Sequence, residues 1–554
     1  MHHLSFVSHD PIFEFQGLRL SAQIFTFQNV YAPDASQLNI KSVEDGFSWT
    51  SDSLTWANGQ EKAEGNFFLD ATCREGRSYL HARAVHVSEE IRCLKLTIRD
   101  VPTGSIANLR QPALEEQDCP IPPEGMILKY PEGFTGLYTP LLVVRHAEDR
   151  FTSFRSQDEQ VRPKVFALLP HGTSMDVELI FEASARSFGH SIDVPVWEIA
   201  SWCSYQHILE EQRLFVEKAY ELMPWETRPD VPAWARSIAL VASIHCCHWT
   251  GYVFNTYDDV LRNLQEIARY VPPFRVLAYL PGWEGRYYYQ YGEFAPDPRL
   301  GGAKGFRRLM EATKDMGMHV MPMFMINGAN PHHEGFKTWG KDSLYHSPSG
   351  FPQYWGSCDW DTSRHYDHNC GVALNPGAPQ WQDHLVGQVR SLISEYGFDA
   401  VFMDLAAVFC NDLRYDTHQA VIDIARRIRE DHPQVLVAGE GWYDAISAPM
   451  PLTQPSLTPK GDCRWSDRPY APLFDTYCRC FGHLGTGDPS RASTGVFEFG
   501  WNNLTQGTPL RKGIIPTITI VDGTLKSGPE KSYAIFRQAN DYARLFLKPT
   551  IDLL

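Results

Sequence analysis

Apolar and polar residues alternate one by one through many short runs in the first third of the chain. Five such runs, each bounded by turn residues, cover residues 18–30, 78–87, 91–101, 136–146 and 174–184. Alternation with a period of two is typical of a strand that buries one face, and many such strands are typical of an antiparallel sandwich. The pattern therefore predicts an N-terminal antiparallel β-sandwich domain over residues 1–190.

The pattern changes to a helical period after residue 190. Apolar residues recur at helical spacing through residues 192–222, and a proline-rich stretch, ETRPDVPAW, follows at 226–234. Proline cannot continue a helix and holds the preceding residue in an extended conformation. We therefore expect a helical linker over residues 191–234 that separates two domains.

Beyond the linker, apolar runs of strand length alternate with amphipathic helical segments. The eight apolar runs are residues 237–246, 275–283, 319–327, 399–407, 435–442, 472–480, 494–501 and 515–523. Apolar strands that alternate with helices form parallel sheets, and eight such units over about 300 residues are the number in a (β/α)₈ barrel. A doubly wound sheet is the alternative, but no GxGxxG motif follows the first run. The prediction is an α/β fold with a TIM barrel over residues 235–545 and a tail over 546–554.

Bulk composition excludes some partners. The 554 residues carry a formal net charge of −16, whereas a nucleic-acid-binding protein needs a concentrated basic face. The sequence has no run of about 18 uncharged apolar residues that could cross a bilayer. Aromatic residues make up 13% of the chain, including 15 Trp; their rings are surfaces on which sugars stack, although they also fill large cores. We expect neither nucleic acid nor a membrane as a partner.

The 12 cysteines are scattered through the chain, and no CxxC pair occurs. Several lie inside apolar runs, which is typical of reduced, buried thiols. The first 17 residues lack the basic segment followed by an apolar one that a secretory signal needs. These features favour the cytoplasm and give no reason to expect a structural zinc ion or a cofactor. They leave the oligomeric state open.

Two carboxylates end neighbouring apolar runs. Asp404 ends AVFMD, and Glu440 ends VLVAGE on the next predicted strand. In (β/α)₈ barrels the chemistry lies at the C-terminal ends of the strands, and a carboxylate that follows four apolar residues is costly to bury without a partner. The alternative is a structural aspartate whose side chain caps the loop after the strand.

The expected distance between these two carboxylates suits one kind of chemistry. Neighbouring strands lie about 4.8 Å apart, so groups at their ends approach within several ångströms. A separation of about 5 to 5.5 Å is what a retaining glycosidase needs for its nucleophile and proton donor. Two such groups also push their pKa values apart, which keeps one ionised and one protonated near neutral pH. The pattern therefore indicates a glycoside hydrolase.

The sequence around both carboxylates resembles a known group of enzymes. Residues 397–408, GFDAVFMDLAAV, and 435–445, VLVAGEGWYDA, are similar to the fourth and fifth strands of retaining barrel glycosidases for α-linked sugars, in the α-amylase superfamily and the endo-α-N-acetylgalactosaminidase family. Residues 375–399 resemble the helix before the nucleophile strand in α-galactosidase-like families. The resemblance, which covers residues 235–545, implies a double-displacement mechanism with Asp404 as the nucleophile and Glu440 as the acid/base.

Departures from these families leave an alternative open. The α-amylase pattern has an Arg two residues before the nucleophile, where this chain has Phe402, and a His-Asp pair on the seventh strand that this chain lacks. In α-galactosidase-like enzymes the acid/base is on the sixth strand, which would assign that role to Asp475 in PLFDTY. Asp475 is therefore the alternative acid/base.

Polar and aromatic side chains after several strands suit an oligosaccharide or glycoside substrate. Planar amides and carboxylates form paired hydrogen bonds with sugar hydroxyls, and aromatic rings provide a stacking surface. The loop after the second strand is rich in both, with four tyrosines beside Trp283 and Glu284. The expected substrate contacts are Trp283, Glu284, Arg286, His245, Asn327, Asp361, Trp442, Glu498 and Trp501.

Two other functions compete with the glycosidase. Residues 356–370 are dense in Asp and His, from Asp359 to His368, and such a loop could hold a metal in a barrel lyase or hydrolase. The EF-hand spacing and its central Gly are missing, so we prefer a loop that contacts substrate and assign no metal ligand. The second competitor is a barrel that binds carbohydrate without catalysis, because a fold alone does not fix function.

Overall fold

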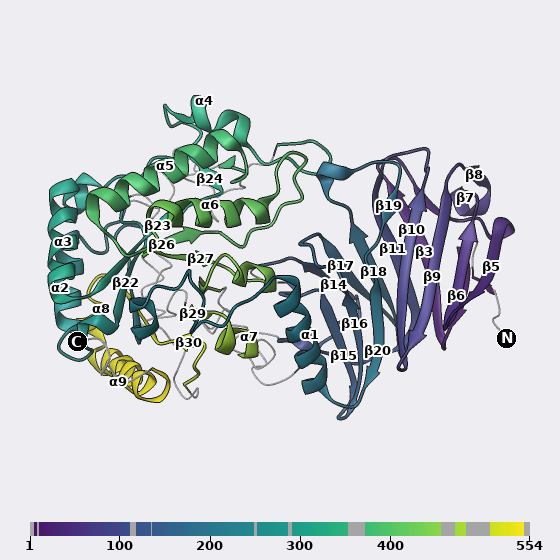
Figure 1. Cartoon of the computed structure of the whole chain (residues 1–554), viewed down its shortest axis with the longest axis horizontal. Coiled ribbons are helices and arrows are strands. Elements are labelled where there is room, and N and C mark those ends of the chain that lie inside the picture. Colours follow the sequence, from purple (N-terminus) through teal and green to yellow (C-terminus); the bar gives the residue numbers. More distant parts are fainter. Residues whose placement is uncertain are drawn as a thin grey trace. The chain divides into compact units, whose positions relative to one another are not determined.

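The computed structural model of the chain describes residues 5–7, 10–110, 118–133, 136–248, 252–285, 291–352, 372–455, 471–482 and 510–547. The chain falls into two compact units. The N-terminal unit comprises Met1–Tyr220 with Pro348–Gly350 and Asn411–Arg414, and the barrel unit comprises Glu221–Ser347, Phe351–Cys410 and Tyr415–Leu554. Figure 1 shows antiparallel strands in the first unit and strands alternating with helices in the second.

Two antiparallel sheets form the N-terminal unit. The first contains, in spatial order, β14 (Met126–Tyr130), β17 (Lys164–His171), β18 (Ser174–Glu182), β11 (Ile91–Pro102), β3 (Leu18–Thr26), β4 (Val30–Pro33), β7 (Leu54–Trp56) and β8 (Glu61–Ala63), with β1 (Ser5–Val7) and β2 (Asp10–Phe15) beside β3. The second contains β13 (Asp118–Pro120), β12 (Ser105–Arg110), β15 (Leu141–Ala147), β16 (Arg150–Ser156), β20 (Trp197–Trp202), β10 (Arg77–Val85), β9 (Asn66–Arg74), β6 (Gly46–Ser51) and β5 (Leu38–Val43), with β19 (Ile192–Asp193) beside β10.

The two sheets pack face to face, as the alternating pattern predicts. Every second residue of β18 is buried, so one face of the strand enters the core. The rings of Phe13 on β2 and Trp49 on β6 have centroids 5.6 Å apart, and those of Phe166 on β17 and Trp197 on β20 are 5.5 Å apart. Because each pair joins one strand from each sheet, the apolar faces meet in an aromatic core.

The segment after residue 190 differs from the predicted helical linker. Its first part is strand: β20 pairs with both β16 and β10 inside the second sheet. The helix α1 covers only Tyr205–Ala219 and begins at Ser204, whose hydroxyl accepts a hydrogen bond from the His207 N–H. The short apolar run on β20 fits either a helix or a buried strand, and its pairing partners lie far away in the sequence, so the local pattern could not decide between them.

The barrel unit is built on a parallel sheet. Its strands follow the order β21 (Leu240–Ile244), β22 (Val276–Leu280), β23 (His319–Met325), β26 (Ala400–Asp404), β27 (Leu436–Glu440), β28 (Leu452–Gln454), β29 (Arg479–Phe481), β30 (Ile514–Ile515) and, beside β21, β31 (Thr517–Ile520). β30 pairs with β29 and β31 pairs with β21, and only Pro516 separates the two. The Pro516 carbonyl also accepts a hydrogen bond of 2.9 Å from Val241 N. Residues 514–520 therefore act as one eighth strand that joins the two ends of the sheet into a barrel.

The predicted sixth and seventh strands need correction. Residues 472–480 are not one strand: they contain helix α7 (Ala471–Thr476) followed by β29, which takes the seventh place in the barrel. The sixth place belongs to β28, a strand of three residues that the sequence pattern did not indicate. Such a short run carries too few residues to show any period. The predicted strand at 494–501 lies outside the described residues.

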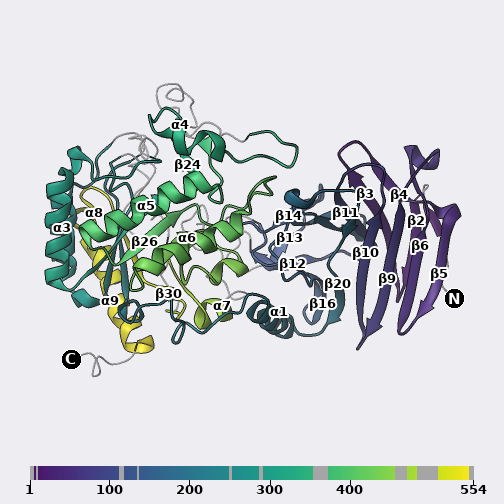
Figure 2. The ribbon, with the colours of Figure 1, turned by 45° about the horizontal axis from the view of Figure 1, so that its top comes forward.

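Helices surround the barrel strands. The long ones are α2 (Tyr257–Ile267), α3 (Gly302–Met316), α5 (Pro379–Tyr396), α6 (Thr417–Asp431) and α9 (Pro529–Phe546), and the short ones are α4 (Phe336–Trp339) and α8 (Thr524–Ser527); β24 (Gly328–Ala329) pairs with β25 (Val372–Ala373). Figure 2 shows α3, α5, α6 and α9 outside the strands. Among the described residues, no helix is long and apolar enough to cross a membrane.

The barrel interior changes from apolar to polar along the strands. One buried core cluster includes Tyr279 on β22, Phe402 on β26 and Ala438 on β27. Because side chains alternate between the two faces of a strand, the next inward positions are Asp404 and Glu440. Both carboxylates therefore lie at the C-terminal end of the barrel, above an apolar layer.

Candidate active site

Asp404 and Glu440 meet at the ends of adjacent strands. β26 and β27 pair in parallel with Met403 opposite Gly439, which brings the two carboxylates to the same level. The residues are only 7% and 9% exposed, and their side chains are hydrogen-bonded to each other. The contact favours a state in which one of the two carboxyl groups keeps its proton.

The preference for a retained proton follows from burial. Burial raises the pKa of Asp404 well above its ordinary value, and the neighbouring charge of Glu440 raises it further. The Tyr291 hydroxyl acts in the opposite direction, because it donates a hydrogen bond of 2.9 Å to Asp404 Oδ2 and so favours the ionised form. Burial and Glu440 thus favour a protonated carboxyl in the pair, whereas Tyr291 favours the ionised form of Asp404.

The backbone after Asp404 fixes the position of Glu440. Leu405 has a φ of 54°, in the left-handed region that non-glycine residues rarely adopt. In this conformation its N–H donates a hydrogen bond of 3.0 Å to Glu440 Oε2. The Ala407 N–H donates a second bond, also of 3.0 Å, to the Glu440 carbonyl. Strained backbone that orients a buried carboxyl is common at functional sites.

Tyr291 was not singled out by the sequence. It is one of four tyrosines in the loop after the second strand, and nothing in the local sequence distinguishes it from the others. In the structure it is fully buried, and its backbone carbonyl accepts a hydrogen bond of 3.0 Å from Asn330 N. The contact with Asp404 joins residues 113 positions apart, so only the fold reveals it.

Glu284 is a third buried carboxyl at this end of the barrel, in the loop after β22. It is 1% exposed, and burial raises its pKa to about 8. Two glycines with positive φ shape the loop: Gly282 at 66° and Gly285 at 89°. A Cβ on Gly282 would lie 2.2 Å from the Cys247 carbonyl oxygen, so the close approach of the loop to β21 requires glycine there.

Asn327 follows β23 and touches the same backbone turn as Glu440. It is 3% exposed, and its Nδ2 donates a hydrogen bond of 3.1 Å to the Leu405 carbonyl. The structure thus places this expected substrate contact beside the carboxylate pair. His245, at the end of β21, is 2% exposed, and its ring lies 6.2 Å from that of Phe254.

Gln454 occupies the end of the sixth strand. It pairs with Glu440 in the parallel register of β27 and β28, and its Nε2 donates a hydrogen bond of 3.2 Å to the Gly482 carbonyl. The sequence did not indicate this residue because it did not indicate β28. Residues 456–470, which follow the strand, lie outside the described residues.

Asp475 does not end a barrel strand. It lies in α7, before β29, and its Oδ1 accepts a hydrogen bond of 2.8 Å from Gly513 N, just before β30. Asp475 therefore lies at the N-terminal ends of these strands, opposite to Asp404. The expectation of a strand-end carboxylate at this position is wrong, because the apolar run around it is a helix rather than a strand.

Trp283 and Trp442 are packed in the interior rather than forming stacking surfaces. The Trp283 ring is fully buried against Phe306 of α3, with ring centroids 5.0 Å apart, and its N–H donates to the Met323 carbonyl at 2.9 Å. The Trp442 ring is also fully buried, and its N–H donates to Ser447 Oγ at 2.9 Å. The prediction that their rings contact sugar is wrong, because each ring fills the protein core.

Several other expected contacts lie outside the described residues. These are Arg286, Asp361, Glu498 and Trp501, together with the whole segment from Asp359 to His368 that could have held a metal. Their roles stay predictions.

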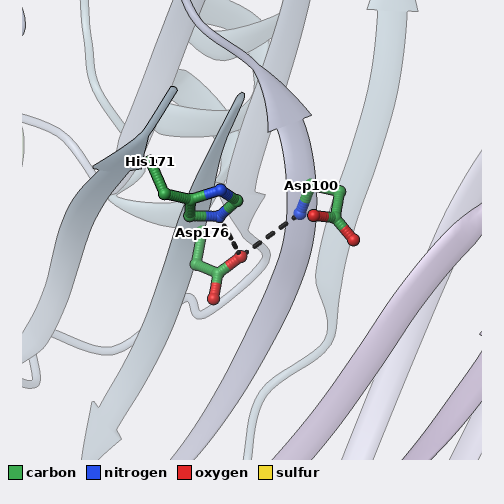
Figure 3. Close-up of side chains that lie close together, drawn as sticks. All are labelled: Asp100, His171 and Asp176. Atoms are coloured by element: carbon green, nitrogen blue, oxygen red, sulfur yellow. Dashed lines mark hydrogen bonds and ion pairs between the residues drawn. The ribbon is translucent and has the colours of Figure 1, made fainter. Parts of the chain in front are cut away.

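Among the described residues, one group of Asp and His side chains lies close enough together to hold a metal. Asp100, His171 and Asp176, on β11, β17 and β18, have ligand atoms within 4.8 Å of one another (Figure 3). His171 Nε2 lies 3.0 Å from Asp176, whereas Arg19 pairs with Asp100 and Arg99 with Asp176 at 3.2 Å. Cationic side chains already balance these carboxylates, so we interpret the group as an ion-pair network on the sheet.

Comparison with solved structures identifies relatives of this fold. No protein-family model matches the chain, and no curated protein is a significant match. The alpha-N-acetylgalactosaminidase NagBb from Bifidobacterium bifidum is similar at 13% identity, with TM-scores of 0.64 ligand-free and 0.66 in its GalNAc complex. The alignments cover 97% and 98% of this chain and 92% of NagBb. This chain shares the fold of NagBb. A GH36 alpha-galactosidase, AgaA from Geobacillus stearothermophilus, gives a TM-score of 0.49 at 13% identity, over 95% of this chain and 73% of AgaA.

Proposed function

We propose that the protein is a retaining glycoside hydrolase for an α-linked sugar, with Asp404 as the nucleophile and Glu440 as the acid/base. The observation that carries the proposal is the buried, hydrogen-bonded pair of carboxyl groups at the ends of adjacent barrel strands. One ionised and one protonated carboxyl in contact are the two groups that a double displacement uses. The location also fits, because barrel enzymes carry their chemistry at this end of the strands.

The closeness of the pair favours retention over inversion. Inverting glycosidases hold their carboxyls about 6.5 to 9.5 Å apart, because a water molecule must fit beside the sugar, whereas retaining ones hold them about 5 to 5.5 Å apart. Glu440 acts on Asp404 through its charge and a side-chain hydrogen bond, so the two carboxyls lie too close for the wider, inverting arrangement.

The proposed reaction has two steps. In the first, Glu440 gives its proton to the glycosidic oxygen while an Asp404 oxygen attacks the anomeric carbon, so the leaving group departs as an alcohol and a glycosyl ester forms on Asp404. In the second, Glu440 takes a proton from water, and the water oxygen attacks the anomeric carbon and releases Asp404. Two inversions give net retention, and the enzyme returns to its starting protonation state.

Two neighbours prepare the carboxyls for these roles. The Tyr291 hydroxyl donates to Asp404 Oδ2 at 2.9 Å, which orients the nucleophile and favours its anion. The Leu405 N–H donates to Glu440 Oε2 at 3.0 Å, which orients the proposed proton donor. Both donors lie on the chain itself, so the geometry exists before substrate binds.

The first substrate class to test is α-N-acetylgalactosaminides. The shared fold with an alpha-N-acetylgalactosaminidase supports this choice. The panel therefore begins with p-nitrophenyl α-N-acetylgalactosaminide and adds the α-galactoside, the α-glucoside and the matching β-anomers. Turnover of an α-glycoside supports the proposal. Sugar binding without turnover of any member would instead favour a non-catalytic binding barrel.

Substitution of the two carboxyls tests their roles. We expect Asp404→Asn and Glu440→Gln each to lower kcat by about 10³-fold while the unfolding temperature stays near that of the wild type. Asp475→Asn tests the alternative acid/base, and we expect its kcat to stay within a few-fold of that of the wild type. Near-normal turnover in either of the first two variants contradicts the assignment.

Azide rescue then separates the two roles. With Asp404→Gly, azide should occupy the vacated position and give the β-glycosyl azide. With Glu440→Ala, azide should attack the glycosyl enzyme and give the α-glycosyl azide. The reverse pattern would exchange the roles of the two residues.

A further inference from the structure

Glu284 is a buried carboxyl that the described chemistry does not use. It is 1% exposed, and in the described part of the chain neither Oε1 nor Oε2 has a hydrogen-bond partner on another residue. Nearly all buried polar groups in folded proteins are hydrogen-bonded, because an unpaired one costs a few kcal/mol. Proteins retain an unpaired buried polar group mainly where that group serves binding or catalysis.

The position of Glu284 relates this carboxyl to the catalytic pair. After β22 the chain continues through Trp283, whose ring packs against Phe306 of α3, to Glu284. The charge of Glu284 adds to the rise in the pKa of Asp404, behind burial and Glu440, and also to that of Tyr279, the inward tyrosine of β22. Glu284 therefore lies near enough to Asp404 for its charge to act there, in the loop that follows β22 at the C-terminal end of the barrel.

The surroundings of Glu284 disfavour its ionised form. Groups near it whose ionised form is negative come from several elements of the barrel unit: Asp404, Asp297, Cys246, Tyr257 and Tyr279. The cation Arg299 donates to the Asp297 carboxylate and to the Gly285 carbonyl. Burial, with a smaller contribution from the charge of Asp297, raises the pKa of Glu284 to about 8.

A second unpaired polar atom lies on the neighbouring strand. Asn327 donates through Nδ2 to the Leu405 carbonyl, but its Oδ1 has no partner among the described residues. β22 and β23 pair in parallel, so the loops carrying Glu284 and Asn327 leave the barrel side by side. The loops after β22 and β23 thus carry a carboxyl and an amide oxygen that both lack partners in the described part of the chain.

We propose that Glu284 binds the sugar as an uncharged acid, donating a hydrogen bond to one ring hydroxyl of a glycoside held against Asp404, while Asn327 Oδ1 accepts from a second hydroxyl. The proposal rests on the proposed glycosidase function and specifies how that site recognises its substrate. A protonated carboxyl has one donor and one acceptor, which matches a sugar hydroxyl. Sites that pair buried groups with a substrate hydroxyl reject analogues that lack it.

Two substitutions separate binding by an uncharged acid from other roles. Glu284→Gln keeps a neutral donor and acceptor of nearly the same shape, so kcat/KM on the best glycoside of the panel should stay within about five-fold of wild type near pH 6.5. Glu284→Leu removes both, and kcat/KM should fall about 10- to 100-fold, mainly through KM. Glu311→Gln, an exposed glutamate on α3, is the control and should change neither value.

Thermal unfolding gives a readout that a merely structural residue would not produce. Glu284→Leu replaces an unpaired buried carboxyl with an apolar group, so its unfolding temperature should rise while its activity falls. A lower unfolding temperature with lost activity would mean that Glu284 supports the fold, and it would overturn the proposal. A loss of 100-fold or more in Glu284→Gln would overturn it as well, because it would show that the ionised form is needed.

The protonation state can be tested without any enzymatic activity. The unfolded chain ionises Glu284 above its ordinary pKa of 4.5, whereas the folded chain keeps the proton up to about pH 8. As the pH rises from 4.5 to 8, the free energy of unfolding of wild type should therefore fall relative to that of Glu284→Gln. Above pH 8 the difference between the two free energies should stay constant. Parallel stability curves for the two proteins would overturn the uncharged acid.

The two proposals can fail separately. If wild type hydrolyses no member of the panel, the glycosidase function fails, while the pH dependence of stability still decides whether Glu284 is uncharged. Failure of every panel sugar to bind, measured by calorimetry, would overturn the sugar-binding role of Glu284 itself.

Discussion

At the scale of single residues, Tyr291 favours the ionised form of Asp404, the proposed nucleophile. Its hydroxyl donates to Asp404 Oδ2 at 2.9 Å inside a site where burial and the charge of Glu440 both raise the pKa of Asp404. Such a donor stabilises the Asp404 anion, which attacks the sugar in the proposed mechanism. Removing it should leave Asp404 protonated to a higher pH.

We therefore expect Tyr291→Phe to lower kcat/KM about 10-fold at neutral pH, because a hydrogen bond to a charged group contributes about 1.5 kcal/mol or more. The acid limb of the pH–rate profile should also move to higher pH, since the pKa of Asp404 rises. Tyr270→Phe, which removes a hydroxyl that contacts Tyr533 on the outer helices, is the matched control. An unchanged acid limb in Tyr291→Phe would show that this hydroxyl does not influence the nucleophile.

The sequence predicts some of these residues and misses others for physical reasons. Asp404 and Glu440 follow apolar runs, and a buried carboxylate at a strand end is informative without any knowledge of long-range contacts. Tyr291 reaches Asp404 only through the fold. Trp283 and Glu284 were predicted together as substrate contacts, yet the Trp283 ring packs against Phe306 of α3, a contact that only the fold reveals.

At the scale of elements, the turn after β22 brings the loop that carries Glu284 close to the backbone of Cys247. Gly282 has a φ of 66°, and a Cβ there would lie 2.2 Å from the Cys247 carbonyl oxygen. Gly317, at the C-terminus of α3, has a similar φ of 77° but open space around it. An alanine at Gly317 would cost only the left-handed backbone conformation, whereas an alanine at Gly282 would also collide with the Cys247 carbonyl.

We expect Gly317→Ala to lower the free energy of unfolding by about 1 kcal/mol, which is the cost of a left-handed conformation. Gly282→Ala should lower it by about 2 to 4 kcal/mol, because the displaced turn adds an overpacking cost, and it should also reduce kcat/KM. Denaturant unfolding of both variants measures the difference. Equal losses would mean that the turn can move away from Cys247 without cost.

The elements that the sequence predicted best are those with many residues in one period. α2, α3, α5, α6 and α9 each overlap an amphipathic segment between or after the apolar runs, and the first five barrel strands lie within those runs. β28 has only three residues and gives no period. α7 and β29 share one apolar run, so a single strand over 472–480 was the simplest interpretation, and it placed Asp475 at the wrong end of the barrel.

At the scale of the whole molecule, the alternating and apolar patterns together predicted an antiparallel sandwich followed by a parallel barrel. The shared fold with NagBb over 97% of this chain agrees with that architecture, at an identity of only 13%. Neither pattern could show how the barrel closes. Closure depends on residues 514–520, in which the part before Pro516 pairs with β29 and the part after it pairs with β21. Closure is what brings the strand ends, and with them the carboxyl groups, around one centre.

The central claim is that Asp404 forms a covalent glycosyl ester. The most direct measurement is mass spectrometry of the protein after reaction with a fluorinated α-glycosyl fluoride whose sugar matches the best panel substrate, since the fluorine slows release of the ester. We predict one adduct per chain, located on the peptide that contains Asp404 and absent in Asp404→Asn. An adduct on Glu440 or another residue, or hydrolysis of the α-glycoside without any adduct and with inverted configuration, would contradict the account.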